Sequence, residues 1–169
     1  MDLPQRKKTR LTEYDYSTGG YYFITACAKD KQCIFGTAAG RGILEAPYVE
    51  LSSAGKQVES ALSFLNTHSK DICVDKYVIM PNHIHMILIV KENCGASRCK
   101  RPTNAGIPMF LSSLKRYTNR QMGQNLWQTG YYDHIIRNEE DYLRIWQYID
   151  GNPAKWEEDK YFDCRARHP

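Results

Sequence analysis

The 169-residue sequence lacks any apolar run long enough to cross a lipid bilayer. Its longest apolar stretch, residues 77–90, is interrupted by a proline, an asparagine and two histidines. The first ten residues, MDLPQRKKTR, are basic but are not followed by an apolar segment, so no secretory signal is expected. We therefore expect a cytoplasmic protein with no membrane association, whose six cysteines are reduced thiols.

The sequence shows no internal repeat and no low-complexity segment. It has one closely spaced cysteine pair in a polar segment. Cys94 and Cys99 are separated by four residues in a polar segment with no second close pair after them, which favours free thiols over a zinc site. The length suits one compact domain. We predict a single domain over residues 1–169, with a basic N-terminal arm at about 1–12 and a flexible loop at about 91–106.

Positive charge is in slight excess, and it is unevenly distributed. The formal net charge is +4, and the basic residues gather in three segments. Such patches suit a phosphate backbone, while an ordinary solvated surface is the alternative. The residues concerned are Arg6, Lys7, Lys8 and Arg10 at the N-terminus, Arg98, Lys100 and Arg101 in the loop, and Lys115, Arg116 and Arg120 on a predicted helix.

Hydrophobic periodicity and turn residues predict alternating strands and helices. Strands are predicted at 19–28, 72–80, 83–90 and 126–136, helices at 52–69, 107–123 and 138–153, and short extended pieces at 33–51. The Pro81-Asn82 corner implies an antiparallel pair, and we expect the helices to gather on a common face of the sheet. This order predicts an α+β fold, a ferredoxin-like sandwich with helices packed on a central antiparallel sheet.

Two histidines lie in the apolar strand predicted at 83–90. Because alternate side chains of a strand share a face, His83 and His85 point the same way and can converge on one metal ion or, when protonated, on one phosphate. A single half-buried histidine is commonly a structural residue, but a pair needs two separate partners. A metal or catalytic site and a purely structural role both remain open, and a tight metal site would need a third ligand from elsewhere.

The C-terminal helix offers candidate partners for the histidines. Tyr148 and Asn152 are four residues apart, which places them on one helical face, although Pro153 disfavours helical angles at Asn152. Asparagine offers a carbonyl oxygen as a metal ligand, and tyrosine offers a phenol that can act as a nucleophile. The chain contains 12 tyrosines, so spacing alone does not single out Tyr148.

A family resemblance does single it out. The segment MPNHIHMIL resembles the His-hydrophobic-His (HUH) signature of single-tyrosine transposases, and residues 131–161 and 10–36 resemble the C-terminal and N-terminal parts of bacterial REP-associated tyrosine transposases. The resemblance implies that His83 and His85 bind the metal and that Tyr148 is the nucleophile. Asn152 stands where related insertion-sequence transposases carry a glutamine that completes the metal site.

The resemblance also implies an activity: metal-dependent cleavage and strand transfer of single-stranded DNA through a 5′-phosphotyrosine, at hairpins of repetitive extragenic palindromes. It implies Mg²⁺ or Mn²⁺ as the cofactor, a nucleoid-associated location, and a monomer or a homodimer. His134 and Arg137 are expected to contact DNA or to brace Tyr148. The tyrosine pairs at 14/16 and 131/132 are expected to stack on bases or to pack in the core.

Two rival functions remain. A domesticated relative of such a transposase would bind DNA hairpins without cutting them. A metal-dependent phosphohydrolase would use water as its nucleophile and would tolerate Tyr148→Phe.

Overall fold

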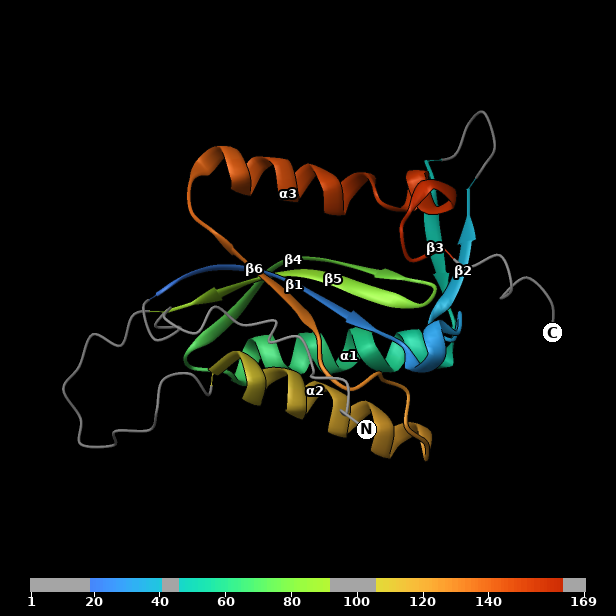
Figure 1. Ribbon diagram of the computed structural model, residues 1–169. Helices are drawn as coiled ribbons and strands as arrows, with labels where there is room; N and C mark the ends of the chain where they lie inside the picture. The colour runs from blue at the N-terminus through green and yellow to red at the C-terminus, as the bar shows by residue number, and fades with distance from the viewer. Residues whose placement is uncertain (1–18, 41–45, 92–105, 163–169) are drawn as a thin grey trace, which may run out of the picture.

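The computed structural model describes residues 19–40, 46–91 and 106–162, which form a four-stranded antiparallel sheet between helices (Figure 1). The strands are β1 (Gly20–Cys27), β4 (Ile72–Met80), β5 (His83–Val90) and β6 (Tyr132–Ile136), in the spatial order β4-β5-β1-β6. With α1 (Ser53–His68) after β1 and α2 (Gly106–Met122) after β5, the chain has the β-α-β-β-α-β order of a ferredoxin-like fold. The predicted fold class is confirmed.

The apolar run that contains the histidines is buried on both sides of the sheet. In β5, every residue from His83 to Leu88 is buried, as expected for a strand covered on two faces. Pro81 and Asn82 make the tight turn before it, and Met80 pairs with His83 across that turn. The predicted antiparallel pair is therefore present.

The sheet has a separate apolar core on each face. One core lies under α1 and α2 and includes Ile24, Ile84 and Met86, whereas the other includes Phe23 and Ile87. The second core is covered by α3 (Glu139–Gly151), which lies on the opposite side of the sheet from α1 and α2 (Figure 1). The expectation that all helices gather on a common face is wrong for α3, because both faces of the central strands are apolar and each needs a cover.

The third helix begins and ends where the sequence predicts. The side chain of Asn138 caps its N-terminus by accepting a hydrogen bond from the Asp141 amide at 2.8 Å. Asn152 is the C-terminal cap, and Pro153 then opens the short 3₁₀ helix η3 (Pro153–Glu158). Through η3 the chain turns back toward the sheet beside β5.

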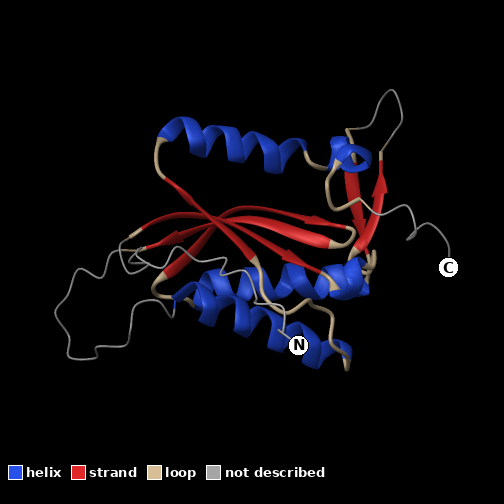
Figure 2. Cartoon of the chain, viewed as in Figure 1, coloured by secondary structure: helices blue, strands red, loops and turns tan. Residues whose placement is uncertain are grey.

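The remaining described segments cover the ends of the sheet. The extended pieces predicted at 33–51 form a hairpin of β2 (Gly36–Ala39) and β3 (Tyr48–Leu51) at one end of the sheet (Figure 2). The short 3₁₀ turn η1 (Lys29–Lys31) follows β1. The strand predicted at 126–136 begins as a regular strand only at Tyr132. Trp127, near the predicted start, forms an isolated β-bridge with Ala28, is buried in the α1/α2 core and donates its indole N–H to Thr118.

Some predictions fall on segments outside the described residues. The basic arm at about 1–12 and nearly all of the loop at about 91–106 belong to these segments. Among the described helices, none combines the length and the apolar character that a membrane span requires.

Candidate active site

The side chains of His83 and His85 lie on the face of the sheet that α3 covers. Both side chains are fully buried, and their Nε2 atoms lie 3.0 Å apart. The predicted shared face of the two imidazoles is therefore present in the fold. The rings meet nearly edge to face, with centroids 4.4 Å apart.

The Nδ1 atom of His83 has a hydrogen-bond partner that determines which ring nitrogen of His83 carries the proton. His83 Nδ1 is 2.8 Å from Asn82 Oδ1, while Asn82 Nδ2 donates to the carbonyls of Lys31 at 3.2 Å and of Tyr161 at 2.8 Å. Those two carbonyls fix the orientation of the amide, and its oxygen can only accept a hydrogen bond. His83 therefore carries its proton on Nδ1, and its Nε2 lone pair points toward His85.

His85 has an equivalent support from the neighbouring strand. Its Nδ1 lies 2.8 Å from the hydroxyl of Thr25, the residue paired with it in β1. Burial lowers the pKa of His83 to about 4 and lowers that of His85 well below its ordinary value, which the neighbouring imidazole also depresses. Both rings are thus neutral at pH 7, the state in which imidazole binds a metal.

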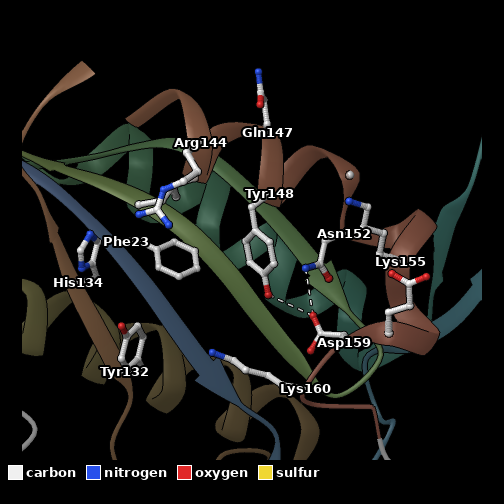
Figure 3. A pocket seen from close by; sticks show the side chains of 13 residues that line it. Phe23, Tyr132, His134, Arg144, Gln147, Tyr148, Asn152, Lys155, Asp159 and Lys160 are labelled. Carbon is white, nitrogen blue, oxygen red and sulfur yellow. Dashed lines mark hydrogen bonds between the residues drawn. The ribbon is translucent and has the colours of Figure 1, made fainter. Parts of the chain in front are cut away.

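Tyr148 reaches this pair from α3. Its hydroxyl is 3.2 Å from His85 Nε2. The hydroxyl also donates to Asp159 Oδ2 at 3.2 Å (Figure 3). The edge of its ring packs against Phe23, and the side chain as a whole is 41% exposed. Burial, followed by the negative charge of Asp159, raises the pKa of Tyr148 to about 12, so the phenol is protonated at neutral pH.

Asp159 is the residue that sequence reasoning missed. Asp159 is the residue directly after η3. The ligand atoms of His83, His85 and Asp159 all lie within 4.8 Å of one another. The backbone amide of Tyr161 holds the other carboxylate oxygen at 2.7 Å. No helical or strand period relates residue 159 to the other site residues, so the pattern of the sequence held no signal for it.

Asn152 lies beside this cluster and holds Asp159. It adopts helical angles despite the following proline, and its Nδ2 donates to Asp159 Oδ2 at 3.2 Å. Asn152 Oδ1 is buried and has no hydrogen-bond partner among the described residues. Two neutral imidazoles and a carboxylate within 4.8 Å of one another form a donor set that fits a divalent cation, and the unpartnered oxygen of Asn152 belongs to the amide that holds the carboxylate.

A pocket of about 600 Å³ opens in front of Tyr148. It lies between α3, the sheet and the segment after η3, and Figure 3 shows the Tyr148 hydroxyl and Asp159 directed into it. His134 lines the pocket and bonds Asp141 of α3 through Nε2 at 2.8 Å, so it connects β6 to the start of that helix. Arg137 is exposed in the turn between β6 and α3.

The other predicted DNA contacts are not gathered at this pocket. Lys115 and Arg116 lie on α2, on the opposite side of the sheet, and the Lys115 ammonium donates to the carbonyls of Gln128 and Gly130 at 2.8 and 2.7 Å. Arg120 lies on the same helix. The N-terminal residues Arg6, Lys7, Lys8 and Arg10 and the loop residues Arg98, Lys100 and Arg101 lie outside the described residues.

The two tyrosine pairs have separate outcomes. Tyr131 packs against the α1/α2 core, whereas Tyr132 is 47% exposed and lines the pocket. The pair at 14 and 16 lies outside the described residues.

The fold, the buried histidine pair and the tyrosine beside it match the features that the sequence shares with single-tyrosine transposases. The chain belongs to the IS200-like transposase family, whose model matches residues 53–152, from the start of α1 to the cap of α3. The matched segment contains both histidines and Tyr148, so the predicted family is confirmed.

Individual relatives agree with this assignment. A REP-associated tyrosine transposase of Escherichia coli is 27% identical over 82 residues, which cover 48% of this chain and 44% of the relative. An uncharacterized protein of Haemophilus influenzae is 31% identical over 95% of this chain and 94% of its own length. The solved structure of a REP-associated tyrosine transposase bound to a REP hairpin superimposes with a TM-score of 0.60. It covers 89% of this chain and 77% of that chain at 22% identity, and so shows the same fold.

Proposed function

We propose that this protein cleaves and rejoins single-stranded DNA at REP-type hairpins in a metal-dependent reaction, through a covalent 5′-phosphotyrosine at Tyr148. One observation carries the proposal: the Tyr148 hydroxyl is 3.2 Å from His85 Nε2, within the same group of side chains that forms a metal-binding donor set. A tyrosine with a purely structural role has no need to meet two neutral imidazoles and a carboxylate.

His83, His85 and Asp159 are the proposed metal ligands, with the Asn152 carbonyl oxygen beside them. Compared with the set expected from the sequence, the carboxylate adds a negatively charged oxygen, the donor that Mn²⁺ and Mg²⁺ prefer. When bound, the cation withdraws charge from the non-bridging oxygens of the scissile phosphate and makes the phosphorus more electrophilic. Thr25 and Asn82 orient the two imidazoles from behind.

The Tyr148 oxygen is the proposed nucleophile. It attacks the phosphorus while the bond to O3′ breaks; the phenol loses its proton and O3′ gains one, which leaves a free 3′-hydroxyl on the departing strand. Asp159 Oδ2 accepts the hydrogen bond of the phenol and directs its oxygen into the pocket. One phosphodiester replaces another, so a 3′-hydroxyl can reverse the reaction and rejoin a strand without an external energy source.

The proposed substrate is supported by the family and by the related structure, which is described as bound to a REP hairpin. We propose the basic arm with Arg6, Lys7, Lys8 and Arg10, and the loop with Arg98, Lys100 and Arg101, as contacts to the hairpin backbone. We also propose that His134, which lines the pocket, and Arg137, in the turn between β6 and α3, contact a single strand that enters it.

A denaturing gel tests the proposal. The protein is incubated with labelled hairpin DNA carrying single-stranded flanks and with Mn²⁺. We expect a slow, protease-sensitive band that disappears with EDTA and in Tyr148→Phe. Tyr142→Phe is the matched control, because Tyr142 lies on the same helix but bonds Asp75 at the edge of the sheet, and it should form the adduct normally.

Other outcomes assign one of the rival functions. Cleavage without a covalent band, retained in Tyr148→Phe, would indicate a hydrolase that uses water. A hairpin that binds tightly and stays intact, with or without Mn²⁺, would indicate a non-catalytic DNA-binding protein.

A further inference from the structure

The pocket extends past Tyr148 toward β6, beyond the proposed metal ligands. In this part its lining includes the aromatic rings of Phe23 and Tyr132 and the basic side chains of Lys160 and Arg144 (Figure 3). Its volume of about 600 Å³ is in the range of small-ligand sites. None of these four residues has a role in the proposed chemistry.

We propose that this part of the pocket is a nucleotide subsite, in which one unstacked base next to the scissile phosphate lies against Tyr132 and the phosphate of that nucleotide contacts Lys160. The inference rests on the proposed function, because it specifies how single-stranded DNA enters that site. Its ligand is a nucleotide of single-stranded DNA, recognised by its aromatic face and its charge.

Tyr132 presents an uncovered aromatic surface at the edge of the sheet. It is the first residue of β6, an outer strand, and its side chain is 47% exposed on the face that carries Phe23 and Tyr148. Phe23 supports it edge-on, with the ring centroids 6.5 Å apart and the planes at 72°. A supported, solvent-exposed ring at the mouth of a pocket is the kind of platform on which single-stranded DNA stacks.

Lys160 brings a positive charge to the same place from the other side of the pocket. Its ammonium lies 5.4 Å from the centroid of Tyr132 and 5.0 Å from that of Tyr161. It forms no ion pair with a carboxylate in the part of the chain that the structure describes. A lysine held over aromatic rings is available to a phosphate that arrives with the base.

The position of Lys160 relative to the proposed metal ligands fixes which nucleotide is involved. Lys160 directly follows the proposed ligand Asp159 in the chain, and its ammonium lies 5.0 Å from the ring centroid of Tyr161. The Tyr161 ring in turn lies beside the imidazole of His83, with the centroids 4.6 Å apart. A phosphate that contacts Lys160 would be the scissile phosphate or the one next to it, so the base at Tyr132 belongs to a nucleotide adjoining the cleavage point.

The test uses binding without chemistry, in EDTA and with Tyr148→Phe as the background. The probe is a DNA hairpin with single-stranded thymidine flanks, in which one 2-aminopurine replaces each flanking thymidine in turn. We expect one position where fluorescence is quenched on binding. There, Tyr132→Leu should abolish the quenching and weaken binding about tenfold, the loss typical of one stacked base. Tyr132→Phe should retain both.

A control variant and a test of the phosphate contact make the result specific. Tyr48→Leu removes an equally exposed tyrosine, 49% accessible, from β3 and should leave the quenching and the affinity unchanged. Lys160→Gln should weaken binding and reduce the salt dependence of log K by about 0.7, the value for one phosphate contact to a single strand, whereas Lys160→Arg should preserve the slope.

The subsite and the proposed strand transfer fail in different ways. If the wild-type protein forms the covalent adduct but no flank position depends on Tyr132, the subsite is wrong and the strand-transfer function stands. If Tyr132-dependent quenching occurs but no adduct forms under any condition, the subsite stands and strand transfer is wrong.

Discussion

At the scale of single residues, Asn82 joins three segments around the site through one side chain. Its oxygen accepts from His83, and its amide nitrogen donates to the carbonyls of Lys31 and Tyr161. One side chain thus sets the tautomer of a proposed metal ligand and also attaches the segment that carries Asp159. In the sequence this residue is visible only as the second half of a turn.

Replacing Asn82 should weaken metal binding without touching a ligand. We expect Asn82→Ala to reduce Mn²⁺ affinity about 10- to 100-fold, because the His83 ring loses the acceptor that orients it. Asn82→Asp keeps that acceptor but loses the two hydrogen bonds that the amide nitrogen donates, so it should lose less Mn²⁺ affinity than Asn82→Ala. Titration calorimetry with Mn²⁺, on variants whose circular dichroism matches the wild type, measures both affinities. Equal losses in the two variants would contradict the orienting role.

The buried histidines make the stability of the metal-free protein depend on pH. In the unfolded chain, imidazole titrates near pH 6.5. In the folded protein, burial lowers the pKa of His83 to about 4 and that of His85 well below the ordinary value. Between about pH 6.5 and 4 the unfolded chain therefore binds more protons, and the free energy of unfolding falls as the pH falls.

The size of this pH effect can be bounded and measured. Each imidazole contributes at most about 1.4 kcal/mol per pH unit within the window. Urea unfolding in EDTA at pH 7 and pH 5 should show the loss, and His83→Gln should reduce it, since one of the two titrating groups is gone. An identical loss in wild type and variant would show that other groups are responsible.

At the scale of elements, the placement of α3 positions Tyr148, the proposed nucleophile. Ile145 and Ile149 of this helix are buried against Phe23 and Ile87 of the sheet, and Tyr148 stands next to this contact. Asn138 and the three acidic residues of the first turn stabilise the helix start. The attachment of the helix to the sheet therefore decides how far the phenol reaches toward the imidazoles.

Truncation of the helix contact should destabilise the fold. We expect Ile149→Ala to lower the free energy of unfolding by about 2–4 kcal/mol, because it opens a cavity in the small core under α3. Leu143→Ala, on the same helix but 49% exposed, should change it by less than about 0.5 kcal/mol. Urea denaturation of both variants provides the comparison. A loss in Leu143→Ala as large as that in Ile149→Ala would show that the helix does not dock through this core.

At the scale of the whole molecule, the candidate site is complete within one chain. The histidines, Asp159 and Tyr148 all come from the same copy, and the phenol already contacts His85. Two of these groups lie on a central strand and two on the C-terminal part, which covers the face of the sheet toward which the histidines point. An exchange of helices between two chains is not needed to bring them together.

A mixing experiment tests whether the site works in one chain. We expect no covalent adduct when His83→Ala and Tyr148→Phe proteins are combined, because neither variant holds a full set of groups. Adduct formation is followed on a denaturing gel, with an equal mixture of wild type and Tyr148→Phe as the positive control. An adduct formed by the mixture of the two variants would show that Tyr148 of one chain acts with the histidines of another.

Much of the fold could be predicted from local patterns. Ser52 and Asn138 cap helices as expected, the Pro81-Asn82 corner joins an antiparallel pair, and the alternation of β5 places both histidines on one face. These features depend on contacts within a few residues, which the sequence displays directly. The side of the sheet that α3 covers was not visible, because a strand that is apolar on both faces does not show which helix lies on which side.

The sequence by itself determined the histidine pair, the tyrosine that its family resemblance selects, and the order of the elements that carry them. Only the tertiary structure decided that Asp159 joins the histidines, that Asn152 holds this carboxylate, and that Tyr132 rather than Tyr131 faces the pocket. The reason is physical. Local periods relate residues within one element, whereas the 3₁₀ turn after Pro153 folds a distant segment back across the sheet, where hydrogen bonds to residues far away in the sequence hold it.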